Sequence, residues 1–241
     1  MLWQSLQISV WKYRYLVMSI IYKRRLYVIL FSALWLLATV ATTYAQSKSI
    51  AQAPILKLQN GDLLFVGAST VNLSGAIDRV TQTSAKTAFD HVALIEITQD
   101  STFIIHANTK AGSVREPLSE YLANNTSDNP HYVIYRLKSD YQFAIPSAVR
   151  QAKKWLGLPY NFSYILNDDS LYCSDFIERV FRDNQIFTLE PMTFIDPATQ
   201  QTDTFWKSYY QKLNLEVPEG LPGCNPNGLA ASDKLEYIGQ W

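Results

Sequence analysis

The chain has 241 residues, with 21 basic and 21 acidic side chains, so its formal net charge is zero. This length is sufficient for one domain with a substantial hydrophobic core. Because no basic stripe runs through the sequence, nucleic acid is not expected among its partners.

Segment 1–45 predicts export. It contains five basic residues and no acidic residue, and its apolar stretch 26–40 is followed by small residues up to Ala45, a pattern typical of a cleaved signal peptide. The alternative is an uncleaved anchor that holds the protein at the membrane, because the uncharged run is about as long as the ~20 residues that span a bilayer. We therefore expect a periplasmic or cell-surface protein, with segment 46–241 as one domain of 16 basic and 21 acidic residues.

The first part of this domain predicts a strand and a polar loop. Asn60-Gly61 marks a turn, and the apolar run after it is short enough for a buried strand. Residues 67–87 are rich in Ser, Thr, Gly and Asn, so we expect a loop, with one helical turn around Ile77 and Val80. Such a loop could border a substrate cleft.

Segments 89–97 and 102–107 predict a hairpin of two strands joined by a short turn. If the hairpin is centred on that turn, paired residues have numbers that sum to 199, so His106 lies opposite Ala93. His91 shares a face with Ala93 because side chains alternate along a strand, and the two imidazoles become diagonal neighbours. An odd loop or a bulge would move one histidine to the other face.

The remaining chain predicts a strand, several helices and a long irregular region. Segment 132–137 is rich in β-branched and aromatic residues, as strands are. Segment 146–156 has helical periodicity with proline at its start and glycine after its end. A short extended piece and a small helix are expected on either side of Leu118. Segment 190–241 is expected to be a loop-rich C-terminal extension with one helix at 205–213.

A further helix is predicted to begin at Cys173. Its apolar residues recur at the three-and-four spacing of one helix face: Cys173, Phe176, Ile177, Val180 and Phe181. The polar run 167–170 is expected to cap its first free N–H groups. Because a helix N-terminus carries partial positive charge, we expect the Cys173 thiol to ionise more readily than a thiol in a core.

Cys173, His91 and His106 together supply the parts of a cysteine hydrolase site. Cys173 is the expected nucleophile, and His91 is the expected general base, which takes the thiol proton and returns one to the leaving group. His106 would hold His91 in the correct tautomer. The backbone N–H of Cys173 and the hydroxyls of Tyr160 or Tyr172 are candidates for oxyanion or substrate binding.

A disulfide is the structural alternative for the cysteine. Cys173 and Cys224 are an even pair, and in an oxidising compartment a bridge between them would leave a non-catalytic exported binding module. No metal site is expected, because His91 and His106 lack a second local ligand. The sequence contains neither a phosphate loop nor a dinucleotide fingerprint, so no cofactor is expected.

Five motifs in this sequence resemble those of a known enzyme family. They are Asn60-Gly61-Asp62-Leu63-Leu64-Phe65, Asp90-His91-Val92-Ala93-Leu94, Phe103-Ile104-Ile105-His106-Ala107, Gly157-Leu158-Pro159-Tyr160-Asn161 and Tyr172-Cys173-Ser174-Asp175-Phe176. Together they resemble the YiiX/YebB-like permuted papain-like cysteine hydrolases, relatives of the NlpC-type cell-wall peptidases. The histidine precedes the cysteine here, whereas ordinary papain-like enzymes place the cysteine first, so the order looks permuted.

This resemblance implies an α+β, circularly permuted papain-like (NlpC-like) fold, in which the cysteine helix packs against an antiparallel, barrel-like sheet that carries the histidine. It also implies Cys173 as nucleophile, His91 as base and position 106 as the third, polar residue. Many relatives look to have glutamate at that third position, whereas this chain has His106. A neutral histidine holds an imidazolium less strongly than a carboxylate does.

We therefore expect an exported cysteine hydrolase, an amidase or peptidase that cleaves peptide or γ-glutamyl-type amide bonds of cell-wall-type peptides through a thioacyl intermediate. The alternative is a lipid acyl hydrolase or acyltransferase that uses the same three residues, because the superfamily includes both activities. Aromatic residues such as Trp206, Tyr209 and Tyr210 would suit an apolar cleft, although such residues commonly belong to a core. In either case the expected partner is a peptide or an acyl small molecule.

Overall fold

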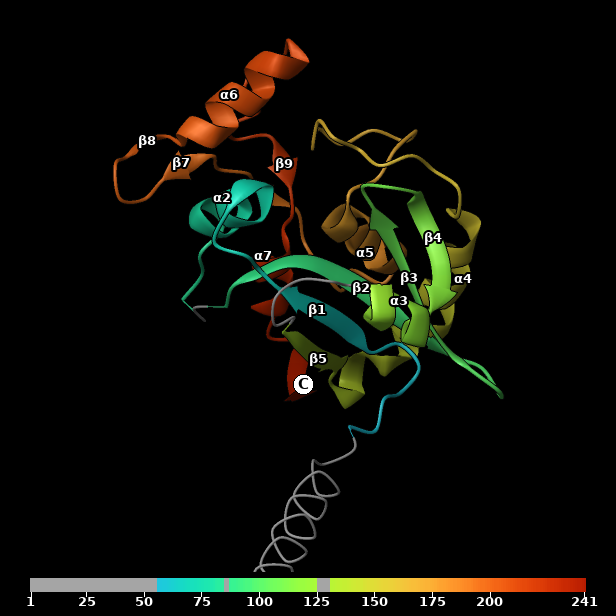
Figure 1. Ribbon diagram of the computed structural model, residues 1–241. Helices are drawn as coiled ribbons and strands as arrows, with labels where there is room; N and C mark the ends of the chain where they lie inside the picture. Colours follow the sequence, from blue (N-terminus) through green and yellow to red (C-terminus); the bar gives the residue numbers. More distant parts are fainter. Residues whose placement is uncertain (1–55, 85–86, 125–130) are drawn as a thin grey trace, which may run out of the picture. The chain divides into compact units, whose positions relative to one another are not determined.

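A six-stranded antiparallel sheet organises the chain (Figure 1). The computed structural model describes residues 56–84, 87–124 and 131–241, which belong to one compact unit. The predicted signal peptide or anchor lies outside the described residues. The strands lie in the order β10-β5-β1-β2-β3-β4 and have these bounds: β1 (Leu63–Gly67), β2 (Phe89–Ile97), β3 (Thr102–Asn108), β4 (Gly112–Pro117), β5 (Tyr132–Leu137) and β10 (Leu235–Gln240).

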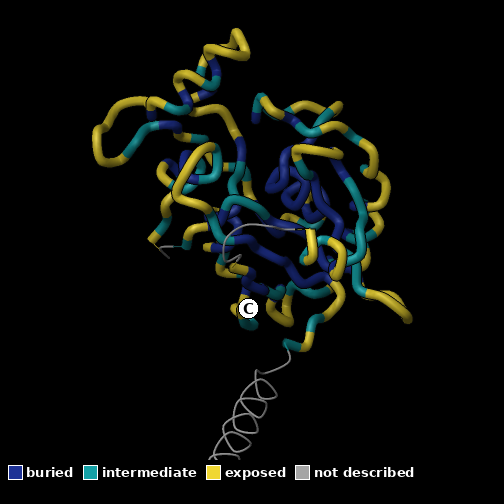
Figure 2. Tube along the Cα trace, in the orientation of Figure 1, coloured by how far each residue is buried: buried dark blue, intermediate teal, exposed yellow. Residues whose placement is uncertain are grey.

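Helices cover the two faces of this sheet. On one face, α4 (Ile145–Lys154) and α5 (Cys173–Arg182) pack against strand residues such as Val92 and Leu94. The short 3-10 helix η1 (Ser139–Ala144) leads into α4. Helix α5 is buried along nearly its whole length and appears dark blue in Figure 2. On the other face, α3 (Leu118–Asn124) packs against residues that include Ala93 and Ile104.

A bulge at the start of β2 breaks the alternation of its side chains. His91 pairs with Val66 of β1, and Phe89 pairs with the following residue, Gly67. Asp90 therefore has no partner in β1 and is the extra residue of the bulge. Phe89 and Val92 consequently belong to the same buried cluster, although strict alternation would put them on opposite faces. Because a bulge reorients the side chains beside it, this end of β2 can present Asp90 and His91 differently from a regular strand.

The backbone of segment 157–161 joins β4 to the start of α5. Ser113 in β4 exchanges two backbone hydrogen bonds of 2.8 Å with this segment. Tyr160 then forms a bridge with Leu171, two residues before α5 begins. The segment therefore holds Tyr160 next to the first turn of α5.

The C-terminal part of the chain is more structured than the sequence predicts. Its elements are β6 (Glu190–Pro191), β7 (Ile195–Asp196), β8 (Gln201–Thr202), α6 (Thr204–Leu213), β9 (Pro222–Gly223), α7 (Pro226–Ala230) and β10. The helix predicted at 205–213 is confirmed as α6. The loop-rich description does not hold for β10, which pairs with β5 in the main sheet. Buried aromatic side chains such as Trp206 pack α6 against α2 (Asn72–Val80).

The predicted cap of α5 is wrong. Its N-cap residue is Tyr172, which makes no side-chain capping hydrogen bond. The polar run 167–170 instead accepts from Arg179, whose guanidinium donates to the Asp168 carboxylate at 3.0 Å and to the Asn167 carbonyl at 2.6 Å. Within the run, the Asn167 side-chain oxygen accepts from the backbone N–H groups of Asp169 and Ser170 at 3.0 and 2.9 Å, so it closes this turn and does not cap the helix.

The strand pairs in the described part of the chain leave β10 and β4 as the edges of the sheet, so a barrel-like closure stays a prediction.

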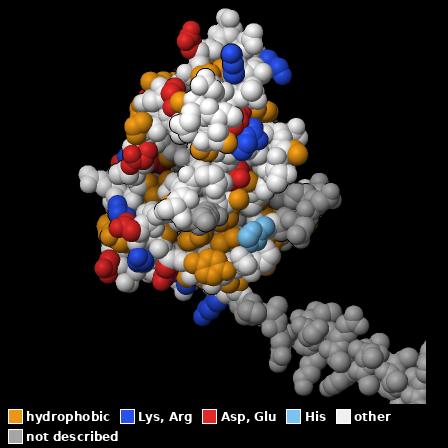
Figure 3. Space-filling view, turned by 90° about the vertical axis from the view of Figure 1, so that its left-hand side faces the viewer, with side chains coloured by type: hydrophobic (Ala, Val, Ile, Leu, Met, Phe, Trp, Pro, Cys, Tyr) orange, Lys and Arg blue, Asp and Glu red, His pale blue; other side chains and the backbone are white. Residues whose placement is uncertain are grey.

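On the face drawn in Figure 3, acidic and basic side chains are scattered among apolar ones. None of the described helices is both long and apolar enough to cross a membrane.

Candidate active site

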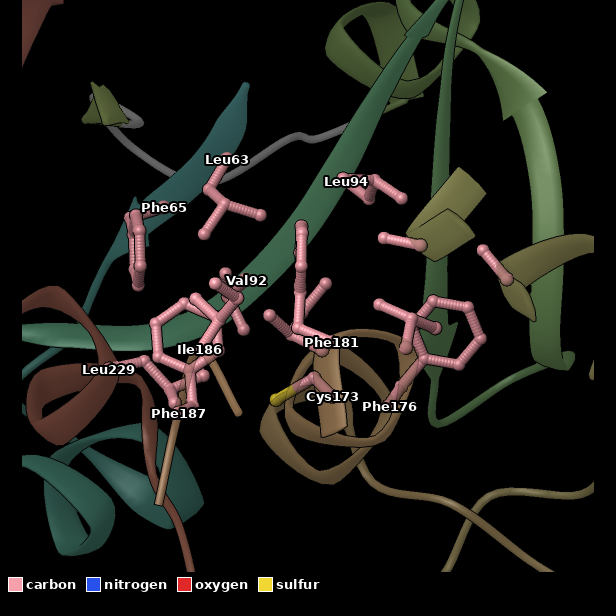
Figure 4. Packing of buried hydrophobic residues seen from close by; sticks show 14 of the residues in the cluster. Leu63, Phe65, Val92, Leu94, Cys173, Phe176, Phe181, Ile186, Phe187 and Leu229 are labelled. Carbon is pink, nitrogen blue, oxygen red and sulfur yellow. The ribbon is translucent and has the colours of Figure 1, made fainter. Parts of the chain in front are cut away.

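Cys173 begins α5 and is nearly enclosed, with 5% of its surface exposed (Figure 4). Its sulfur donates a hydrogen bond to the carbonyl oxygen of Asp90 at 3.9 Å. Burial raises the pKa of the thiol to about 12, and the Asp90 carboxylate adds to the rise, whereas nearby backbone N–H groups lower it. The expectation of a readily ionised thiol is therefore wrong, because desolvation outweighs the helix N-terminus.

The two histidines meet as the sequence predicts. β2 and β3 pair in the register whose residue numbers sum to 199, as Leu94 with Ile105 shows. Nε2 of His91 lies 2.6 Å from Nδ1 of His106. Burial, together with the charge that His106 can carry, holds the pKa of His91 well below its usual value. His91 is therefore unprotonated at pH 7, as a general base must be, and its burial makes it a weaker base than a free imidazole.

Glu116 of β4 lies behind the histidine pair, and sequence reasoning missed it. Its Oε1 is 2.8 Å from Nε2 of His106. This hydrogen bond lowers the pKa of Glu116, so the side chain is a carboxylate at neutral pH. The alternation of β4 carried a usable signal: Val114 pairs with His106, and Glu116 is two residues further on the same face.

The hydrogen bonds determine which ring nitrogens carry protons. An ionised Glu116 can only accept, so His106 donates to it through Nε2, and in the neutral imidazole Nδ1 is then the accepting nitrogen. His91 then donates from Nε2 to that nitrogen. The series Glu116–His106–His91 therefore leaves Nδ1 of His91 unprotonated, as a general base requires.

Tyr121 of α3 lies against both imidazoles, with ring-centroid separations of 6.4 and 5.4 Å. Burial raises the pKa of Tyr121, and the nearby Asp90, Glu116 and Cys173 add to the rise. The Cys173 sulfur donates to the carbonyl of Asp90, the residue before His91, and no hydrogen bond among the described residues joins it to either imidazole. Asp90 therefore links the thiol to the histidine pair in this locality.

Two cavities meet at this locality. The smaller has a volume of about 120 Å³ and is lined by Cys173 and by mainly apolar side chains from α2, α6 and the C-terminal region. The larger has a volume of about 970 Å³, and His91 and His106 line it together with other polar side chains. Asp90 and Tyr160 are among the residues that line both.

Tyr160 and Tyr172 both lie in the wall of the smaller cavity beside Cys173. Burial raises the pKa of Tyr160, and Cys173 contributes to the rise, so its hydroxyl stays protonated and able to donate. The hydroxyl of Tyr172 accepts a hydrogen bond from the backbone N–H of Cys224 at 3.2 Å. Tyr160 is therefore the better oxyanion candidate, and Tyr172 forms part of the cavity wall.

Both cysteines are free thiols in the structure, so the Cys173–Cys224 disulfide is not formed. The alternative of a non-catalytic binding module depended on this disulfide, so the structure gives it no support.

The third histidine of the chain, His131, lies away from the site. Its ring forms a hydrogen bond of 2.9 Å with Gln240, and it lines neither cavity. Within the described residues, no group of three or more His, Cys, Asp or Glu side chains could hold a metal ion.

Comparisons with known proteins agree with this architecture. A protein-family model described as "Permuted papain-like amidase enzyme, YaeF/YiiX, C92 family" matches residues 57–239. An Escherichia coli K12 protein described as uncharacterized protein YiiX is 28% identical over 166 residues, which cover 67% of this chain and 77% of that protein. A crystal structure described as metalloprotein YiiX from Escherichia coli O157:H7 has a TM-score of 0.60 at 21% identity. That likeness, which shows the fold, covers 76% of this chain and 97% of the other.

Proposed function

Because this chain belongs to the permuted papain-like amidases, we propose that it is an exported cysteine amidase with Cys173 as nucleophile and His91 as general base. The observation that carries the proposal is the hydrogen-bonded series from Glu116 through His106 to His91. The series ends next to Asp90, whose carbonyl oxygen accepts from the Cys173 thiol. A nucleophile, a base and groups that orient the base are the parts that covalent catalysis requires.

In the first step, the Cys173 sulfur bonds to the carbonyl carbon of the substrate amide while its proton passes to Nδ1 of His91. A thiol with a pKa of about 12 and an uncharged imidazole do not form an ion pair in advance, so proton transfer accompanies the attack. The positive charge that develops on His91 is stabilised through His106 by the Glu116 carboxylate. The backbone N–H of Cys173 and the Tyr160 hydroxyl stabilise the oxyanion.

The C–N bond then breaks, and His91 returns the proton to the departing amine. The acyl group remains on Cys173 as a thioester. The oxygen of a water molecule bonds to the thioester carbon while His91 takes its proton, and the C–S bond then breaks as His91 gives that proton to the leaving sulfur. The products are a carboxylic acid, an amine and the free thiol.

The proposed substrates are cell-wall-type peptides, on the basis of the predicted export and the amidase family. One observation favours the lipid acyl alternative: the cavity beside Cys173 is lined largely by apolar side chains. Of the aromatic residues in α6, Trp206 lines that cavity, Tyr210 is fully buried and Tyr209 donates its hydroxyl to the Phe162 carbonyl at 2.7 Å. Most of this aromatic set therefore packs the fold.

A mass measurement of the acylated protein tests the function and identifies the substrate class. The protein is incubated separately with muropeptides and with fatty-acyl esters, and its intact mass is recorded. We expect an acyl adduct with muropeptides, mapped by proteolysis to Cys173, and no adduct in a folded Cys173→Ser variant. An adduct that persists in the variant would contradict the role of Cys173, and an adduct only with fatty-acyl esters would support the lipid alternative.

A further inference from the structure

We propose that the two halves of the substrate occupy different cavities: a compact, apolar acyl group beside Cys173 and a polar amine beside His91. The proposal rests on the amidase function above and specifies its substrate class. It depends on which cavity each reacting side chain lines and on the size and polarity of those cavities.

The chemistry of the reaction assigns each half of the substrate to a cavity. After acylation the acyl group is bonded to the sulfur of Cys173, which lines the smaller cavity and not the larger. The departing amine takes its proton from His91, which lines the larger cavity and not the smaller. Asp90 and Tyr160 line both cavities, so the scissile bond lies at the boundary that these residues mark.

The smaller cavity limits the acyl group to a compact apolar one. An apolar cavity of ~150 Å³ is enough to bind benzene, so about 120 Å³ suits a group near the size of a leucine side chain or a phenyl ring. A long fatty chain needs considerably more room. The apolar wall comes from Ile77, Val80, Tyr164, Met192, Phe194 and Trp206.

Charge in the smaller cavity disfavours an anionic acyl group. Among the described residues that line it, the charged side chains are Asp90 and Glu190, and both are acidic. A carboxylate on the acyl group would be repelled by them, and it would also lose its hydration without gaining a cationic partner. Acyl groups with a free carboxylate, such as a γ-glutamyl group, are therefore poor substrates.

The larger cavity suits a polar amine. Its volume of about 970 Å³ lies at the upper end of the ~300–1,000 Å³ typical of ligand pockets, so it can hold several residues of a peptide. Its lining is more polar than that of the smaller cavity: Ser74, Asn108, Lys110 and Asn124 stand beside apolar residues such as Val114. These polar side chains offer hydrogen-bond donors and acceptors that an alkylamine would leave unpaired.

A substrate series tests the division. Glycylglycine carries one of five acyl groups, namely acetyl, isovaleryl, phenylacetyl, octanoyl or hexadecanoyl, and kcat/KM is measured for each amide. We expect the isovaleryl and phenylacetyl amides to exceed the acetyl amide by at least about tenfold and to exceed the hexadecanoyl amide as well. Phenylacetyl-hexylamide, which has an apolar amine, should be at least about tenfold slower than phenylacetyl-glycylglycine.

Two variants test whether the smaller cavity determines which acyl group is preferred. Met192→Ala enlarges the smaller cavity and should raise the octanoyl-to-isovaleryl ratio of kcat/KM at least about fivefold. Leu221→Ala is the matched control: Leu221 is 43% exposed, lies outside the cavity lining and accepts a backbone hydrogen bond from Met192 at 2.8 Å. This control should leave the ratio unchanged.

The outcomes separate this proposal from the function on which it rests. Acylation of Cys173 with equal rates for all acyl groups, with preference for the hexadecanoyl group or with preference for the alkylamine would overturn the two-cavity proposal and leave the amidase function standing. Absence of both turnover and adduct with every compound would overturn both. A ratio that shifts equally in Met192→Ala and Leu221→Ala would remove the smaller cavity as the acyl site.

Discussion

Glu116 places a carboxylate behind the histidine at position 106. Many enzymes that the sequence resembles look to have glutamate there, and a histidine alone would hold His91 less strongly. In the structure a carboxylate is still present, one hydrogen bond further away, because His106 bonds to Glu116 at 2.8 Å and to His91 at 2.6 Å. Under the proposed function, Glu116 is therefore a positioning residue that acts through His106.

Glu116→Gln should lower kcat with little change in KM, because glutamine can donate to His106 and so allow the wrong tautomer. We expect a loss of roughly 10- to 100-fold, smaller than the 10²–10⁴-fold that general acid–base catalysis provides as a whole. Steady-state kinetics on the best acyl-glycylglycine amide measures it. Glu116→Asp should retain more activity than Glu116→Gln, and exposed Glu120 supplies the control Glu120→Gln. An equal loss in the aspartate and glutamine variants would argue against a role for the charge.

Asp90→Asn should lower the pKa of the Cys173 thiol below its value of about 12, because the Asp90 carboxylate is one cause of the rise. The pH dependence of alkylation by iodoacetamide measures this pKa, since the thiolate is the reactive form. Exposed Asp100 provides the control Asp100→Asn. A midpoint that stays unchanged in Asp90→Asn would mean that burial alone sets the thiol pKa.

At the level of single residues, the sequence predicted which side chains lie close together better than it predicted their pKa values. The meeting of His91 and His106 follows from one hairpin register, and a short turn restricts that register strongly. Glu116 required the register of a third strand, which the sequence suggested only as a short extended piece. The thiol pKa depends on how completely the surrounding chain excludes water, and the start of a helix does not determine this.

Among the elements, β4 and segment 157–161 are joined by two backbone hydrogen bonds of Ser113 and by a close approach of the chain at Gly112. Gly112, the first residue of β4, has a φ of +71°, and a Cβ atom there would collide with the carbonyl of Leu158. Gly157 has a φ of +90° but open space around it. Substitution of Gly157 therefore measures the cost of a left-handed conformation alone, whereas substitution of Gly112 adds the cost of a steric collision.

Gly157→Ala should lower the free energy of unfolding by about 1–2 kcal/mol, the cost of a left-handed conformation for a residue with a side chain. Gly112→Ala should cost at least about 2 kcal/mol more, because backbone atoms must also move. Urea unfolding followed by circular dichroism measures both. Equal losses in the two variants would show that the approach of Leu158 to Gly112 is not tight.

Elements with strong periodicity could be predicted, and elements that depend on distant partners could not. The strands at β2 and β5 were predicted with the bounds that the structure has, and the helix at α4 agrees within two residues at either end. Helix α2 was expected only as one turn, because its apolar face becomes clear when α6 packs on it. Strand β10 is a short edge strand with an irregularity near Gly239, so its own sequence gives a weak signal.

At the scale of the whole molecule, the buried site makes stability depend on pH at both ends of the range. The pKa of His91 is lower in the folded chain than the usual 6.5, so the unfolded chain binds more protons just below pH 6.5 and stability falls as the pH decreases. The pKa of Cys173 is raised from 9.0 to about 12, so the unfolded chain loses its proton first and stability falls as the pH rises above 9.

Thermal unfolding from pH 5 to 10.5 tests both signs. The fall in melting temperature above pH 9 should be smaller in Cys173→Ser than in the unmodified protein, and the fall below pH 6.5 should be smaller in His91→Gln. Buried tyrosines with raised pKa values, such as Tyr172, also weaken the fold at high pH, so the alkaline fall should shrink without disappearing. Parallel curves for the protein and both variants would contradict the burial of these two groups.

The pairing of β10 with β5 has a consequence for how the protein is made. About a hundred residues separate these neighbours, and such a distant partner is slow to find during folding. A ribosome or an export channel that delivers the chain from its N-terminus releases β5 well before β10. Until β10 arrives, one edge of β5 offers unpaired backbone groups to any other nascent chain, so yield during biosynthesis should depend on chaperone supply more than the finished enzyme's stability suggests.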